Sequence, residues 1–169
     1  MNAKKAFINA ESYYKTTALI HKEMFKNKEF IMPFYYVRHA LVAFSCELFL
    51  KSLFILEGKE YNHTHGLKDL FGNLSKKAQS RIAEIYDKSS ENSPISKKIL
   101  KEAGFPDEDF SIESILKKAS GNFVKFRYKH EEKKIAKKTY HLHFVLKSIR
   151  EYIIELNPGW PIITMDSDF

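Results

Sequence analysis

The fold of this chain is decided by VRHALVAFSCELFLKSLFILEG, the stretch at residues 37–58. Its apolar side chains recur every three or four residues, a spacing that gathers them on one side of an α-helix. A proline at position 33 suits the first turn of this helix, and Gly58 suits its C-terminal stop. The expected helix therefore spans about residues 33–57, and its stripe is wide enough to predict burial on more than one side. The stripe consists of Val37, Ala40, Leu41, Phe44, Leu48 and Ile55.

Two charges in the middle of this apolar run favour a protein core over a lipid bilayer as its surroundings. Residues 40–56 contain Glu47 and Lys51, and the run is shorter than the ~20 apolar residues that a spanning helix needs. The first residues of the chain are basic, but polar side chains interrupt the apolar stretch that a secretory leader requires. Cys46 has no second cysteine to pair with and is expected to be a core thiol. We therefore expect a cytoplasmic protein with no membrane partner.

The sequence on either side of this helix predicts further helices. The chain has 169 residues, 44% of them apolar, which suffices for one domain without a disulfide or a metal. Ser75 and Ser111 are placed to cap the helices that follow them. We therefore predict an all-α fold, an up-and-down bundle of four to five long helices with a short inserted helical excursion. Helical spacing is found at residues 3–26, 67–74, 76–88, 111–126 and 139–156.

Two segments lie outside this regular pattern. In residues 89–109, Ser, Asn, Pro and Gly cluster around one short helical run at 96–103, which predicts that the inserted excursion lies at the surface. Residues 158–169 follow the last helix and contain two prolines. We expect a helical domain at residues 1–157 and a C-terminal tail that either docks on it or is disordered.

The positive charge of the chain is concentrated in one segment. The sequence has 28 Lys and Arg against 21 Asp and Glu, a formal charge of +7. Residues 117–138 hold nine basic residues and two glutamates, so the rest of the chain balances to zero. Several cations on one surface suit a phosphate backbone, because they release condensed counterions together. The segment therefore predicts nucleic-acid binding, with a solvated helix end and turn as the alternative.

Arg127 and His130 lie in this basic segment and share one face of a helix. At 100° per residue, their side chains project within about 60° of each other, on the same side as Phe123. In a structural interpretation, Arg127 pairs with Glu47 or Glu131 and His130 is a hydrogen-bonded core residue. In a functional interpretation, the pair cleaves RNA without a metal. The histidine then exchanges protons with the ribose 2′-hydroxyl or the leaving oxygen, and the arginine stabilises the charged phosphorane.

The sequence predicts structural roles for other polar residues in the central helix and in the loop after it. Glu47 and Lys51, at positions i and i+4 of an apolar helix, predict a partly buried ion pair. His63 and His65 lie in a loop without a third ligand nearby in sequence, so no metal site is predicted. His65 is expected to cap the helix that follows it.

The order and spacing of these motifs resemble the HEPN domains (higher eukaryotes and prokaryotes nucleotide-binding), in the branch with a late Arg-Tyr-x-x-Glu helix. The resemblance covers about residues 3–156. It rests on a long first helix, on a second helix with Ala43, Glu47, Lys51 and Leu53 that ends at Gly58, on HGLKDL at residues 65–70 and on FVKFRYKHE at residues 123–131.

The resemblance implies a homodimeric helical bundle that, in many members, cleaves RNA without a metal or other cofactor in phage-defence or toxin–antitoxin systems. It implies Arg127 and His130 as the catalytic pair, and an antitoxin or a nucleotidyltransferase as a protein partner. Active members place four to six residues between the arginine and the histidine, whereas this chain places two. The alternative is a non-catalytic helical module that binds a nucleotide or a protein.

The remaining predicted site residues surround that pair. The supporting residues Glu47 and Lys51 are expected to orient Arg127 or Tyr128. The substrate-contacting residues are Lys125, Tyr128, Lys129, Lys133 and Lys134, and the supporting residues are Glu47, Lys51, His65 and Glu131.

Overall fold

The computed structural model describes five segments and one isolated residue of the chain. These are residues 2–27, 29, 31–60, 65–91, 109–120 and 141–163. All regular secondary structure in these ranges is helical, which confirms the predicted all-α bundle. The helices are α1 (Ala3–Lys26), α2 (Ile31–Leu56), α3 (Leu67–Gly72), α4 (Lys76–Glu91), α6 (Ile112–Ala119) and α8 (Leu142–Leu156).

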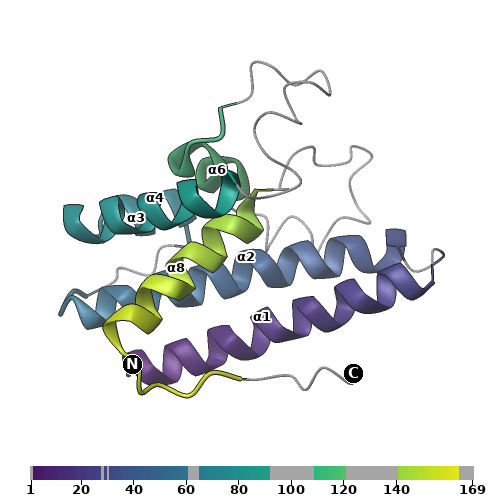
Figure 1. The fold of residues 1–169 in the computed structure, drawn as a ribbon, viewed down its shortest axis with the longest axis horizontal. Coiled ribbons are helices and arrows are strands. Elements are labelled where there is room, and N and C mark those ends of the chain that lie inside the picture. Colours follow the sequence, from purple (N-terminus) through teal and green to yellow (C-terminus); the bar gives the residue numbers. More distant parts are fainter. Residues whose placement is uncertain are drawn as a thin grey trace.

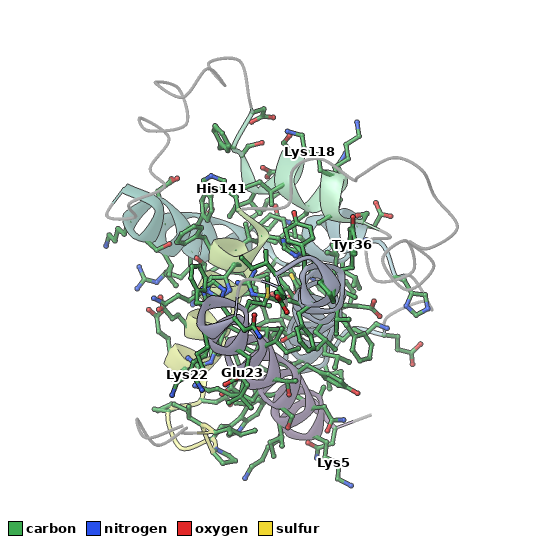
Figure 2. The ribbon with its side chains drawn as sticks, turned by 90° about the vertical axis from the view of Figure 1, so that its right-hand side faces the viewer. Lys5, Lys22, Glu23, Tyr36, Lys118 and His141 are labelled. Atoms are coloured by element: carbon green, nitrogen blue, oxygen red, sulfur yellow. The ribbon has the colours of Figure 1, made fainter. Side chains whose placement is uncertain are left out.

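Helix α2 occupies the centre of the bundle. It lies antiparallel beside α1, and α8 crosses the pair obliquely, while α3, α4 and α6 cover the opposite side (Figure 1). Phe49 and Leu50 of α2 are fully buried, as are Phe7 of α1, Ile82 of α4 and Leu146 of α8. These side chains belong to one continuous hydrophobic core, which fills the space between the helices (Figure 2). Burial on more than one side of the central helix is therefore confirmed. The predicted stripe itself was partly wrong, because Ala40 is buried but Val37 is exposed and the other four members are only partly buried.

The apolar character of α2 is explained by this central position. Among the described residues, the segment Pro33–Leu56 is the one stretch long and apolar enough to cross a membrane, with a mean hydropathy of 1.7. However, 72% of that apolar window is buried inside the protein. The core helix of a globular bundle passes the same test of length and composition, so the apolarity of α2 is weak evidence for a membrane span.

Local signals in the sequence set the ends of several helices. The Ser111 hydroxyl accepts a hydrogen bond from the Ser114 amide, and the Ser75 hydroxyl accepts one from the Ala78 amide. Each serine thereby satisfies one amide that has no partner within its helix, as expected of an N-terminal cap. Helix α6 ends at Ala119, so the part of the predicted helix beyond it falls outside the described residues.

Polar contacts inside the core hold α1 against its neighbours. The Glu11 carboxylate is fully buried and receives two hydrogen bonds from the Arg150 guanidinium of α8. The Ser45 hydroxyl of α2 donates to the Ala10 carbonyl, and the Ser52 hydroxyl donates to the Ala3 carbonyl. A buried carboxylate is tolerated when a cation pairs with it in good geometry, and the fork of arginine provides such a pairing. The long sequence separation of these contacts makes them determinants of how the helices are arranged.

The first residues after α8 dock on the bundle. The Trp160 ring lies 5.3 Å from the ring of Phe7, centroid to centroid, at the start of α1. Docking, one of the two alternatives for the tail, therefore holds for Trp160, whereas Pro161 and Ile162 are exposed. Residues 164–169 and the predicted helical run at 96–103 lie outside the described part of the chain.

The stop at the end of α2 depends on one glycine. Gly58 has a φ of +67°, and the two turn-closing hydrogen bonds join its amide to the Ile55 carbonyl and the Lys59 amide to the Phe54 carbonyl. This is the Schellman pattern, in which the residue after the helix adopts the left-handed conformation. An L side chain is strained in that conformation.

We expect Gly58→Ala to lower the free energy of unfolding by about 1 kcal/mol, because the methyl group is strained at positive φ. No atom lies within 4 Å of the position that the new Cβ would take, so the cost is purely conformational. Urea unfolding would measure it. Gly72→Ala is the matched control, because Gly72 lies in α3 and its Cβ would also meet no atom. Equal destabilisation by both changes would contradict this explanation.

Candidate functional site

Three of the eleven predicted site residues lie in the described part of the chain, and the structure brings them together. These are the supporting residues Glu47, Lys51 and His65. The other eight fall in residues 121–140, which lie outside the described residues. They are the catalytic pair Arg127 and His130, the substrate-contacting Lys125, Tyr128, Lys129, Lys133 and Lys134, and the supporting Glu131.

Glu47 is the centre of this three-residue cluster. Its Oε1 accepts hydrogen bonds from Lys51 Nζ at 2.7 Å and from His65 Nδ1 at 2.8 Å. The Glu47 and Lys51 side chains are 5% and 9% exposed, whereas the His65 side chain is 73% exposed. The predicted i,i+4 ion pair is therefore present and is more deeply buried than expected. The cluster joins one turn of α2 to the residues that lead into α3.

The hydrogen bond to Glu47 gives the His65 ring a defined chemistry. A neutral imidazole that donates from Nδ1 carries its basic lone pair on Nε2. A carboxylate that receives the Nδ1 proton fixes both the tautomer and the orientation of the ring, as second-shell carboxylates do for functional histidines. His65 is therefore an oriented, exposed imidazole that could accept a proton or contact a phosphate oxygen.

His65 does not have the capping role that the sequence suggested for it. The residue at the N-terminal boundary of α3 is Gly66, which makes no side-chain cap, and the Lys68 amide in the first turn instead donates to the Ser120 hydroxyl at 3.4 Å. The Nδ1 atom of His65 is used by the Glu47 carboxylate, which offers a charged acceptor in place of a neutral backbone group.

Metal and thiol chemistry find no support next to this cluster. Within the ranges that the structure describes, no group of three or more His, Cys, Asp and Glu side chains is arranged to hold a metal ion. Cys46 precedes Glu47 in α2 and is fully buried. Burial, with a smaller contribution from the Glu47 charge, raises the pKa of the Cys46 thiol well above its usual range. The thiol is therefore protonated at neutral pH, as expected of a core cysteine.

A second polar site joins α8 to α4. The Tyr86 hydroxyl donates to the Phe110 carbonyl at 3.1 Å and lies 3.2 Å from His141 Nδ1. His141 lies at the start of α8, below the end of α6 that carries Lys118 (Figure 2). Tyr86 and Phe110 also line a groove of about 650 Å³ between α4 and α6, together with Asp87, Asp109 and Glu113. The sequence did not single out this groove, because its two walls come from segments more than 20 residues apart.

A third polar site was also missed by the sequence analysis. It consists of basic side chains from three helices, His21 of α1, Arg38 of α2 and His143 of α8, with Lys147 one turn beyond His143. We call these four residues the cationic cluster. Burial, together with smaller contributions from the charges of Arg38, His21 and Lys147, lowers the pKa of His143 to about 4. Arg38 alone gave a sequence signal, as a cation within the most apolar helix.

No protein-family model, curated protein or solved structure matches this chain at a significant level.

We expect Glu47→Gln to lower the free energy of unfolding by about 3–5 kcal/mol, because it leaves the Lys51 ammonium buried without a counter-charge. The double variant Glu47→Leu with Lys51→Met should recover most of that loss, since it removes both charges and keeps the volume. Urea unfolding of the single and double variants measures both effects.

Glu23→Gln is the matched control for this prediction, because Glu23 forms an exposed i,i+3 pair with Lys26 in α1. It should change stability by at most about 0.5 kcal/mol. A double variant less stable than Glu47→Gln would contradict the assignment of the cost to an uncompensated charge.

We also expect His143 to make the protein less stable in mild acid. An unfolded chain protonates this imidazole near pH 6.5, whereas the folded protein does so near pH 4. Between these values the unfolded state binds more protons, so the free energy of unfolding falls as the pH falls, by about 2–3 kcal/mol in total. His143→Gln should lose this component in urea unfolding measured at pH 7 and at pH 4. An unchanged pH dependence in the variant would contradict the prediction.

Proposed function

We propose that this chain is a HEPN-like helical protein that cleaves RNA without a metal ion. The observation that carries the proposal is the Glu47–Lys51–His65 cluster. The resemblance to HEPN domains rests on a Glu-and-Lys helix and on a His-Gly-Leu turn, which are 14 residues apart in sequence between Lys51 and His65. In the structure these two motifs meet through one buried carboxylate. A shared role in one site gives a physical reason for their occurrence together.

The proposed chemistry is carried by Arg127 and His130. His130 exchanges a proton with the ribose 2′-hydroxyl or with the leaving oxygen, so that the 2′-oxygen attacks the adjacent phosphorus. Arg127 stabilises the negative charge that accumulates on the phosphorane. The reaction needs no cofactor, and its product carries a 2′,3′-cyclic phosphate.

Basic residues around this pair bind the RNA backbone in the proposal. Lys125, Lys129, Lys133 and Lys134 neutralise phosphates, and Tyr128 stacks on a base. Two lysines of the same basic segment, Lys117 and Lys118, lie on α6 and are exposed. Figure 2 shows the Lys118 side chain directed away from the body of the protein, as a backbone contact requires.

The supporting residues have separate roles in this proposal. Glu47 and Lys51 fix the His65 ring, which faces solvent and contacts a phosphate oxygen of the substrate. Glu131 lies four residues after Arg127 and pairs with it when no RNA is bound.

The biological setting is part of the same proposal. The protein acts as a homodimer in the cytoplasm, in a phage-defence or toxin–antitoxin system. Its activity is controlled by a partner protein, an antitoxin or a nucleotidyltransferase.

A second candidate function is a non-catalytic helical module that binds a nucleotide or a protein. The observation that favours it is the short spacing of Arg127 and His130, with two residues between them where active HEPN members have four to six. In this case Arg127 and Glu131 are a structural i,i+4 pair, and the basic segment binds without cutting.

The two functions differ in an RNA cleavage assay in the presence of EDTA. Under the first, the wild-type protein cleaves single-stranded RNA and leaves 2′,3′-cyclic phosphate ends. Loss of a general acid–base group typically costs a factor of about 10²–10⁴, so His130→Ala should reduce the rate at least 100-fold. Arg127→Ala should do the same. A DNA strand of the same sequence should stay intact, because it lacks the 2′-hydroxyl.

His63→Ala is the matched control, because it removes another histidine of the chain that has no role in the proposal. It should leave the cleavage rate unchanged. An intact RNA substrate with folded wild-type protein, or full activity of His130→Ala, would reject the ribonuclease and support the binding module.

A further inference from the structure

The inference concerns the cationic cluster of His21, Arg38, His143 and Lys147. Its members come from α1, α2 and α8, and α2 packs against both of the other helices. Arg38 and His143 lie on two helices that pack against each other, and each has a buried nitrogen without a hydrogen-bond partner. The charge of Arg38 also acts on the imidazoles of His21 and His143. Lys147 and His21 act on His143 as well.

Arg38 is a half-buried cation whose charge is not balanced within the described part of the chain. Its Nε atom is buried and has no hydrogen-bond partner. Two other cationic side chains are mostly buried, and each forms an ion pair. Lys51 pairs with Glu47, and Arg150 pairs with Glu11. Burying a guanidinium without such a counter-charge is costly. Burial accordingly lowers the pKa of Arg38.

His143, on α8, also has a buried nitrogen without a hydrogen-bond partner, its Nδ1 atom. The ring lies 5.8 Å from the ring of Tyr14, centroid to centroid, so one side of the imidazole is packed against α1. This nitrogen lost its hydrogen bond to water on folding, which costs free energy that a bound donor or acceptor would recover.

The acidic groups near the cluster are already engaged. Glu11, which lies close to Tyr14, is bound by the Arg150 fork. Glu151 lies 4.0 Å from Lys147 in an exposed i,i+4 pair. On α2, His39 follows Arg38, and its Nδ1 is bonded to the Tyr35 carbonyl. The charge of Arg38 and the two imidazoles of His21 and His143 are therefore left to act on a ligand.

We propose that His21, Arg38 and His143 form a binding site for a phosphate group, with Lys147 at its edge. The planar guanidinium donates two parallel hydrogen bonds to phosphate oxygens, and the imidazoles donate to the remaining oxygens once they are protonated. A phosphate group has a charge of about −1.5 to −2 at pH 7 and three acceptor oxygens, which matches one guanidinium and two imidazoles. The site goes beyond the proposed ribonuclease function and does not depend on Arg127 or His130.

Phosphate binding reverses the electrostatics of the cluster. Without a ligand, burial and three neighbouring cations oppose protonation of His143. A bound phosphate anion favours the protonated imidazole, so the ligand raises the pKa of His143 and of His21. A merely structural cluster of cations would show no such coupling between ligand and histidine.

Histidine proton NMR of the full chain tests the proposal, with inorganic phosphate as the first probe. Ionic strength is held constant with sodium chloride, so that general screening is the same in every sample. We expect saturating phosphate to raise the pKa of His143 from about 4 by at least one unit. Adenosine 5′-monophosphate is the second probe. A tighter response to it identifies a nucleotide as the source of the phosphate, and an equal response identifies the free anion.

Arg38→Gln should weaken phosphate binding at least tenfold and abolish the shift at His143. This variant should fold, because it removes a buried cation that has no counter-charge, and circular dichroism checks that it does. Arg38→Lys keeps the charge but loses the fork, so it should show intermediate affinity. Arg81→Gln is the matched control, because Arg81 is an exposed arginine on α4 paired with Glu155. It should bind phosphate as the wild type does.

Two results would overturn the proposal. One is the absence of any shift at His143 with either probe. The other is a shift of the same size in wild type and in Arg38→Gln, which would show that the anion acts elsewhere on the protein.

Discussion

The arrangement of this protein depends on the burial of α2. This helix is apolar around most of its circumference, so one neighbouring helix cannot remove enough of its surface from water. α1 covers one side, α8 crosses another, and α3 contacts a third (Figure 1). Phe49, Leu50 and Leu53 are buried as a result. The other helices are amphipathic, and each presents its apolar face to this common centre.

The charged groups that enter this core are of two kinds, those with an opposite charge in contact and one without. Glu11 with Arg150, and Glu47 with Lys51, are pairs in which each buried charge has an opposite charge in contact. Such pairs contribute little net stability compared with apolar residues, but they specify which helices meet, because a mispaired arrangement would bury a single charge. Arg38 differs from these pairs, because within the described part of the chain no carboxylate balances its charge. An uncompensated cation at a helix interface costs stability, and a cost of this kind is typical of a binding site.

The two polar regions discussed for function lie on different parts of the bundle scaffold. The Glu47–Lys51–His65 cluster links α2 to the start of α3, and it ends in an exposed imidazole. The cationic cluster joins α1, α2 and α8 and has a buried imidazole nitrogen. Helices hold all of these side chains except His65, which precedes α3 and whose ring is oriented by the Glu47 carboxylate.

The sequence by itself determined the helices and their ends. The bounds of α1 agree with the predicted 3–26, and Ser75, Ser111 and Gly58 act at the helix ends assigned to them. The Glu47–Lys51 pair was also predictable, because an i,i+4 contact depends on helix geometry alone. Only the tertiary structure decided that His65 bonds Glu47 and that the charge of Arg38 acts on His143, 105 positions later in the chain. Contacts of that kind depend on how helices cross, and the crossing is set by the packing of the whole core rather than by any local pattern.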